Sequence, residues 1–110
     1  MAGRATAGRR LGFALVRGDS MLPTLRPADR LLLRYDLRPA PGRVVVVRYA
    51  DGVVAVKRAV ERRRHGWWVR GDASDEVAPG AVDSRYWGEI PEADVLAVAV
   101  ARIWPRPRLL

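Results

Sequence analysis

Cysteine is absent from the 110 residues, and histidine occurs once, as His65. Without cysteine the fold cannot depend on disulfides and no thiolate can bind a metal, which fits a reducing compartment. A single histidine also argues against a histidine-rich metal site. We therefore expect a cytoplasmic protein that uses neither a metal nor another cofactor.

Long apolar runs are missing as well, although 49% of the residues are apolar. The run from Leu11 to Val16 is far shorter than the stretch of ~20 residues that crosses a bilayer. It is also too short for a cleavable secretory signal. We expect a soluble protein without a transmembrane segment, formed by one domain of residues 1–110 with frayed ends at 1–10 and 105–110.

Positive charge is abundant but dispersed along the chain. The formal net charge is +8, and the one run of three basic residues is Arg62 to Arg64. A nucleic-acid site needs clustered cations that bind phosphates, whereas scattered arginines are typical of a solvated surface. We expect no specific nucleic acid as a partner, and at most a peripheral contact with anionic membranes.

Lysine is scarce, because Lys57 is the only lysine among 20 basic residues. Arginine serves equally well as a surface cation, but it does not give up its proton in a protein. A lone lysine in such a chain indicates a position where deprotonation is needed. The alternative is chance retention in an arginine-rich sequence.

Short segments rich in Val, Leu, Trp and Tyr recur between turn-forming residues, which is typical of strands. They are Leu11–Val16, Leu31–Tyr35, Arg43–Tyr49, Val53–Val60, Trp67–Arg70 and Val95–Trp104. Asp51-Gly52 and His65-Gly66 lie between such segments and predict two hairpins. We expect an all-β fold, a small and partly open antiparallel β-barrel, with a long loop from Asp72 to Pro91.

Gly18, Asp19, Ser20 and Met21 follow the first apolar segment. Gly18 permits a tight bend and Pro23 restricts the backbone beyond it, so Ser20 is expected on a rigid turn. That placement suits a catalytic nucleophile. The alternative is an ordinary surface turn.

The partner expected for Ser20 is Lys57. With a strand period of two, Lys57 shares one face with Val53, Ala55 and Ala59, which are small and apolar. Burial on that face would lower the pKa of Lys57 and make it a general base. The alternative is a lysine that reaches solvent from the edge of a strand.

Four short motifs occur in a fixed order within residues 17–104. They are Ser20-Met21-x-Pro23-Thr24-Leu25, Lys57-Arg58, Gly71-Asp72 and Asp83-Ser84-Arg85-x-x-Gly88. In this order they resemble the motifs of the type I signal peptidases. The resemblance implies a serine endopeptidase with a Ser-Lys dyad, on a barrel of the type shared with the self-cleaving repressors.

The resemblance also assigns roles to residues of the site. Ser20 would be the nucleophile and Lys57 its general base. The turn Gly18, Asp19, Ser20, Met21 has no side-chain hydroxyl before the nucleophile, so the backbone N–H of Ser20 is the expected oxyanion donor.

Five supporting residues follow from the same resemblance. Asp83 and Arg85 would form an ion pair that holds the long loop near the site, with Ser84 between them. Asp72 would pair with Arg58.

Two positions depart from the family pattern. Ala73 stands where an asparagine is common, and Ala81 where a serine hydrogen-bonds the catalytic lysine. Ser74, Ser84 or a water is then expected to orient Lys57.

Further matches narrow the resemblance to a subgroup. They are Lys57–Val60, Gly66–Val69, Ala93–Leu96 and Trp104-Pro105. These runs resemble the nickel superoxide dismutase maturation proteases. The resemblance implies removal of an N-terminal leader peptide from a precursor protein, bound as an extended peptide with small side chains beside the cut.

Two other functions remain open at this point. The first is a self-cleaving repressor-type autopeptidase, which shares the dyad but lacks the motif at Asp83, and the about sixteen residues before the first motif are too few for a DNA-binding domain. The second is a non-catalytic nucleic-acid-binding β-barrel whose tryptophans stack on bases. Tryptophans in a small β domain are more often part of the core.

Overall fold

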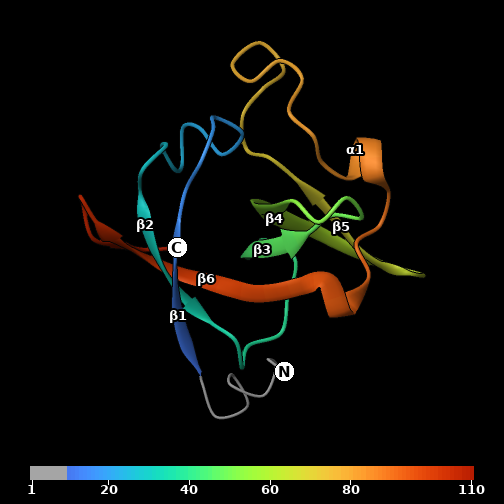
Figure 1. Cartoon of the computed structure of the whole chain (residues 1–110), viewed down its shortest axis with the longest axis horizontal. Coiled ribbons are helices and arrows are strands. Elements are labelled where there is room, and N and C mark those ends of the chain that lie inside the picture. Colours follow the sequence, from blue (N-terminus) through green and yellow to red (C-terminus); the bar gives the residue numbers. More distant parts are fainter. Residues whose placement is uncertain (1–9) are drawn as a thin grey trace.

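The structure is a computed structural model that describes residues 10–110. Most of the predicted frayed N-terminus, residues 1–10, therefore lies outside the described residues. The fold is all-β, as predicted, with seven antiparallel strands in one curled sheet that does not close (Figure 1). Neither helical segment of residues 10–110 is long and apolar enough to cross a bilayer.

The strands follow the predicted segments closely. They are β1 (Leu11–Leu15), β2 (Arg30–Arg34), β3 (Val44–Arg48), β4 (Val54–Arg63), β5 (Gly66–Arg70), β6 (Val95–Trp104) and β7 (Arg108–Leu109). A single helical turn, α1 (Ser84–Trp87), and a 3-10 turn, Glu92–Asp94, lie between β5 and β6. The main difference is β4, which continues past the predicted end at Val60.

Strand β6 is the centre of the sheet, whose order is β1-β2-β6-β3-β4-β5. One edge of β6 pairs with β2, and the other edge pairs first with β3 and then with β7. Figure 1 shows β6 crossing the molecule as one long strand. This arrangement places β1 at one end of the sheet and β5 at the other.

Both predicted hairpins are confirmed. Gly52 turns between β3 and β4 at a φ of 89°, in the left-handed region that favours glycine. Gly66 begins β5 at a φ of 149°, and an added Cβ would lie 2.0 Å from the carbonyl oxygen of Ile90. Glycine at this position thus lets the segment before β6 approach β5.

Strand β3 is buried on both faces, which explains its unbroken run of valines. Val44 and Val46 belong to a first core with Met21 and Leu25. Val45 and Val47 belong to a second core, which lies on the other face. Each fully buried valine stabilises the fold by about 1.5–3 kcal/mol, so the curled sheet is held from both sides.

The prediction of a frayed C-terminus at 105–110 is wrong. Strand β7 pairs with β6, and the N–H of Leu110 donates to the carbonyl of Val100 at 3.0 Å. Arg102 also donates from Nε to the carbonyl of Arg106 at 2.7 Å. The physical reason is that β6 extends beyond β3, and β7 satisfies backbone groups that this edge would otherwise leave unpaired.

Candidate active site

Ser20 lies on a turn that is attached to the first core. The N–H of Val16 donates to Asp29 at 2.9 Å, which closes the segment that follows β1. Gly18 has a φ of 71°, so the tight bend predicted there does require glycine. Met21 is 1% exposed and anchors the turn, while Ser20 itself is half-buried.

Lys57 is buried on β4, opposite Val45 of β3. Only 3% of its surface is exposed, which excludes a side chain that extends into solvent. Burial lowers the pKa of Lys57; the negative charge of Asp83 opposes this effect, and the positive charge of Arg85 reinforces it. A neutral amine is therefore more accessible here than for a lysine in water.

Ser20 and Lys57 line the same hollow, which has a volume of about 450 Å³. The remaining lining comes from Gly18, Asp19 and the loop segment 77–82. Two residues that are far apart in the sequence thus share one solvent-accessible space. Among residues 10–110, no three acidic or histidine side chains lie close enough together to hold a metal ion.

The N–H of Ser20 is available for the oxyanion role expected from the resemblance. Among residues 10–110, the backbone hydrogen bonds outside strands and helices do not use it as a donor. The carbonyl of Ser20, in contrast, accepts from the N–H of Ala73 at 3.0 Å. This bond ties the turn to the segment that follows β5.

Gly71 is a site residue whose role the sequence did not reveal. A Cβ at this position would lie 2.4 Å from the carbonyl oxygen of Ser20 and 3.2 Å from its Cβ. The first distance is too short for any side chain, so glycine permits the Ser20 turn to pack on the backbone after β5. Figure 1 shows the loop after β5 rising beside the turn after β1. The only signal in the sequence was that Gly71 belongs to a motif.

The ion pair expected between Arg58 and Asp72 is present. Arg58 donates from Nη2 and Nε to the carboxylate of Asp72 at 2.6 and 3.1 Å, and from Nη1 to the carbonyl of Gly42 at 2.9 Å. Burial opposes ionisation of Asp72, but hydrogen bonds from Arg58 and Thr24 outweigh it and hold its pKa below the usual value. Asp72 thus attaches the end of β5 to β4 next to Lys57.

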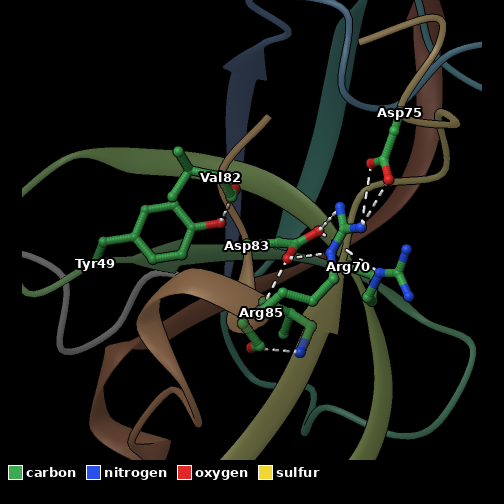
Figure 2. A network of polar contacts seen from close by, with 8 residues as sticks. Tyr49, Arg70, Asp75, Val82, Asp83 and Arg85 are labelled. Carbon is green, nitrogen blue, oxygen red and sulfur yellow. Dashed lines mark hydrogen bonds and ion pairs between the residues drawn. The ribbon is translucent and has the colours of Figure 1, made fainter. Parts of the chain in front are cut away.

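The ion pair expected between Asp83 and Arg85 is also present, within a larger network (Figure 2). Asp83 is 2% exposed and accepts from the N–H of Arg85 at 2.9 Å, which caps α1. The guanidinium of Arg85 donates to Asp83 at 3.1 Å and to Asp75 at 3.1 and 3.3 Å. Arg70 approaches Asp83 at 3.6 Å.

This network holds the pKa of Asp83 below its usual value. Burial works in the opposite direction, but the hydrogen bonds from Arg85 and the N–H of Gly71 outweigh it. The hydroxyl of Tyr49 donates to the carbonyl of Val82 at 3.0 Å and fixes the residue before Asp83 (Figure 2). The loop, β5 and the end of β3 are therefore joined beside Lys57.

The two serines considered as substitutes for the missing family serine lie elsewhere. Ser84 is buried, and its hydroxyl accepts from the N–H of Val69 at 2.8 Å, which joins α1 to β5. Ser74 lines a separate hollow with Asp72. Ala81, in contrast, lines the hollow with Lys57. Position 81, where the family has its serine, thus lies at the site. Neither Ser74 nor Ser84 lines this hollow, so neither supplies the missing hydroxyl there.

A second hollow of about 500 Å³ extends from Ser20 between β1 and β4. Its walls are mainly apolar and include Ala14, Leu15, Val46 and the start of β4. The edge of β1 that faces away from β2 pairs with no strand of residues 10–110. Strand β4 pairs with β5 only from Arg58 onward, so its edge before that residue is open as well. The groove therefore offers backbone groups on both sides to an extended peptide.

Comparison with known proteins links this geometry to a peptidase family. No curated protein matches the chain. Residues 3–85 match the family described as Peptidase S24-like, and the match includes the Ser20 turn, Lys57, and the run from Asp83 to Arg85. The chain therefore belongs to the Peptidase S24-like family.

Proposed function

We propose that this protein is a serine endopeptidase in which Ser20 is the nucleophile and Lys57 is its general base. The observation that carries the proposal is the shared hollow, which is lined by a serine on an anchored turn and by a buried lysine with a lowered pKa. Membership of a peptidase family supports the same activity. Lys57 takes part in no ion pair among residues 10–110, and burying an unpaired ammonium is unfavourable, so Lys57 has no evident structural reason to be there.

The chemistry follows from these two groups. Neutral Lys57 takes the proton of the Ser20 hydroxyl as its oxygen attacks the scissile carbonyl, while the N–H of Ser20 donates to the oxyanion. The resulting lysinium protonates the leaving amine. Water activated by Lys57 then hydrolyses the acyl-enzyme and releases Ser20.

The substrate is an extended peptide in the groove between β1 and β4. Backbone groups on both flanking edges would pair with it, and the aliphatic walls would accept small or aliphatic side chains. Removal of an N-terminal leader from a precursor protein fits this mode of binding. The finer proposal, a nickel superoxide dismutase precursor, rests on the sequence resemblance at Lys57–Val60 and Gly66–Val69.

Self-cleavage is the second candidate function, and the family match favours it, since serine–lysine peptidases of the repressor type cleave themselves. The open groove favours a separate substrate. The two differ in kinetics, because cleavage within one chain has a rate constant independent of protein concentration.

The test is incubation with candidate precursors, including that of nickel superoxide dismutase, followed by mass spectrometry of the new N-termini. We expect a cut after a small residue in a precursor, and no cut with Ser20→Ala. Equal cleavage by a folded Ser20→Ala variant would refute the proposal. A cut found only in the protein itself, at a concentration-independent rate, would establish self-cleavage instead.

A further inference from the structure

Almost all acidic side chains of this chain have a partner within the fold. All 12 belong to residues 10–110, and eight of them form ion pairs there. Asp51 and Glu89 form none, but each accepts a hydrogen bond from a backbone N–H. The carboxylates of Asp19 and Glu76 have neither kind of partner among residues 10–110. The net charge is +8, so a shortage of arginines does not explain this.

Both of these carboxylates lie at the active site. Asp19 is exposed, directly precedes Ser20, and lines the hollow that Ser20 shares with Lys57. Glu76 is also exposed and directly precedes the loop segment 77–82, which forms the opposite wall of that hollow. We call this space the loop-side hollow, to distinguish it from the groove between β1 and β4.

The cations near the loop-side hollow leave Asp19 without a counter-charge. The guanidinium of Arg85 donates to Asp83 and Asp75, so its charge is already matched (Figure 2). Lys57 lines the same hollow, but as a general base it is neutral before the reaction and does not repel a cation. The Asp19 side of Ser20 therefore carries negative charge that only a ligand would neutralise.

The groove on the other side of Ser20 carries the opposite charge. Arg17 lines it among aliphatic walls, and no acidic side chain does. Arg17 takes part in no ion pair within the part of the chain that the structure describes. Gly18 and Ser20 line both spaces, so a peptide that passes Ser20 enters both. A cation on that peptide would be attracted at Asp19 and repelled at Arg17.

We propose that the site selects a peptide with a basic side chain on the side of the scissile bond that faces the loop-side hollow, where the cation pairs with Asp19. The other side of the cut lies in the groove and carries small or aliphatic side chains without positive charge. This inference rests on the proposed function, because the ligand is taken to be a substrate of the Ser20 and Lys57 site. It adds a charge to the substrate and confines that charge to one side of the cut.

The test compares short fluorescent peptides of alanine, valine and glycine. One has no charged side chain, one carries a lysine near its amino end, and one carries a lysine near its carboxyl end. Fluorescence anisotropy with Ser20→Ala measures binding without cleavage, and mass spectrometry with wild type measures kcat/KM. We expect one of the two lysine peptides, and not the other, to exceed the neutral peptide about two- to fivefold in affinity and in kcat/KM at low salt, as an exposed ion pair allows.

The variants are compared by the ratio of the favoured lysine peptide to the neutral peptide. This ratio cancels any general effect of a substitution on the Ser20 turn. Asp19→Asn should bring the ratio to about one in both assays, since an exposed pair contributes no more than its charge attraction. Asp19→Arg should instead favour a peptide with glutamate in place of the lysine.

The matched control is Asp36→Asn, which changes the net charge by the same amount. Asp36 is exposed, pairs with Arg34, and lines neither the loop-side hollow nor the groove. Its ratio should equal that of the protein without this substitution. If Asp36→Asn lowered the ratio as much as Asp19→Asn does, the effect would come from overall charge, and the proposal would be wrong.

Failure of this proposal and failure of the proposed function give different results. Wild type that cleaves peptides, with equal kcat/KM for all three, would overturn the charge selection and leave the peptidase function intact. If wild type cleaves nothing but Ser20→Ala binds one lysine peptide more tightly through Asp19, the charge selection is supported and the catalytic function is not. Equal binding of the three peptides, or binding of none, would overturn the charge selection. Circular dichroism verifies that each variant is folded.

Discussion

At the scale of single residues, Lys57 separates the need for a charge from the need for a removable proton. Lys57→Arg keeps the positive charge and most of the length, but arginine cannot act as a base near neutral pH. We expect it to be as inactive as Lys57→Met. In wild type, acylation should accelerate with pH up to an apparent pKa below that of free lysine, because burial lowers the pKa of Lys57.

Single-turnover assays of wild type, Lys57→Arg and Lys57→Met over a range of pH measure the rate of acylation. Substantial cleavage by Lys57→Arg would remove the general-base role even if Ser20 proved essential.

Gly71 is the second residue with a specific expectation. In Gly71→Ala the new Cβ would collide with the carbonyl of Ser20, so the nucleophile turn must move. A displacement of about 1 Å lowers a catalytic rate by about a hundredfold.

The control is Gly52→Ala, in which the Cβ meets open space but the backbone is strained by a φ of 89°. We expect Gly52→Ala to lose stability and keep the rate per folded molecule. Unchanged turnover in Gly71→Ala would show that the turn tolerates a displacement.

At the scale of elements, α1 and the loop before it set the charges around Lys57. The negative Asp83 raises the pKa of Lys57 and the positive Arg85 lowers it, so the two effects on this pKa oppose each other. Arg85→Ala should therefore move the inflection of the pH–rate profile to higher pH, and Asp83→Ala to lower pH. At any pH well below the inflection, moving it by one pH unit changes the neutral fraction of the lysine about tenfold.

Both substitutions should also loosen the loop from Asp72 to Pro91, since Asp83→Ala removes the cap and the ion pair of α1, and Arg85→Ala removes the ion pair. Limited proteolysis in that loop measures this. If the inflections move in the same direction in the two variants, the opposite effects of Asp83 and Arg85 on the pKa of Lys57 are wrong. If the added protease cuts the loop no faster than in wild type, the ion pair does not hold the loop.

The elements themselves were largely predictable. Alternating small apolar residues placed Lys57 on a buried face, and Asp51-Gly52 placed the hairpin before it, because both signals are local. β7 was not predicted, because the residues before it include Pro105 and Pro107 and have little strand character. Its formation depends on the length of β6, which the local sequence does not reveal.

At the scale of the whole molecule, the buried lysine lowers the free energy of unfolding. Its pKa is lowered in the folded protein, so between that pKa and 10.5 the unfolded chain binds a proton that the folded one does not. Wild-type stability should therefore rise with pH across this window. Lys57→Met has no proton to lose, so near neutral pH it should be the more stable protein. Folding weakens proton binding at Lys57. For every tenfold of this weakening, the free energy of unfolding of Lys57→Met should exceed that of wild type by about 1.4 kcal/mol.

Urea unfolding of both proteins at pH 7 and above pH 10.5 measures the difference. The advantage of Lys57→Met should disappear at the higher pH. A constant difference would mean that packing, and not protonation, sets it.

The net charge of +8 leads to a further expectation for the whole molecule. Trp67 and Trp68 are poor platforms for bases, because Trp67 is buried and Arg63 lies 3.8 Å from the ring centre of Trp68. Affinity for DNA or RNA should be weak and should vanish near physiological salt. Filter binding at low and physiological salt tests this, and tight, salt-resistant binding would restore the nucleic-acid function.

Local periodicity and turn chemistry were enough to predict the all-β class and most strand positions. Motif order predicted a turn serine and a lone lysine at one site, and both line the same hollow. Two other features emerge only in the folded chain: Gly71 supports the Ser20 turn, and β7 completes the edge of β6. Each of these depends on contacts between segments far apart in the chain, and such contacts arise only when the curled sheet brings its strands together.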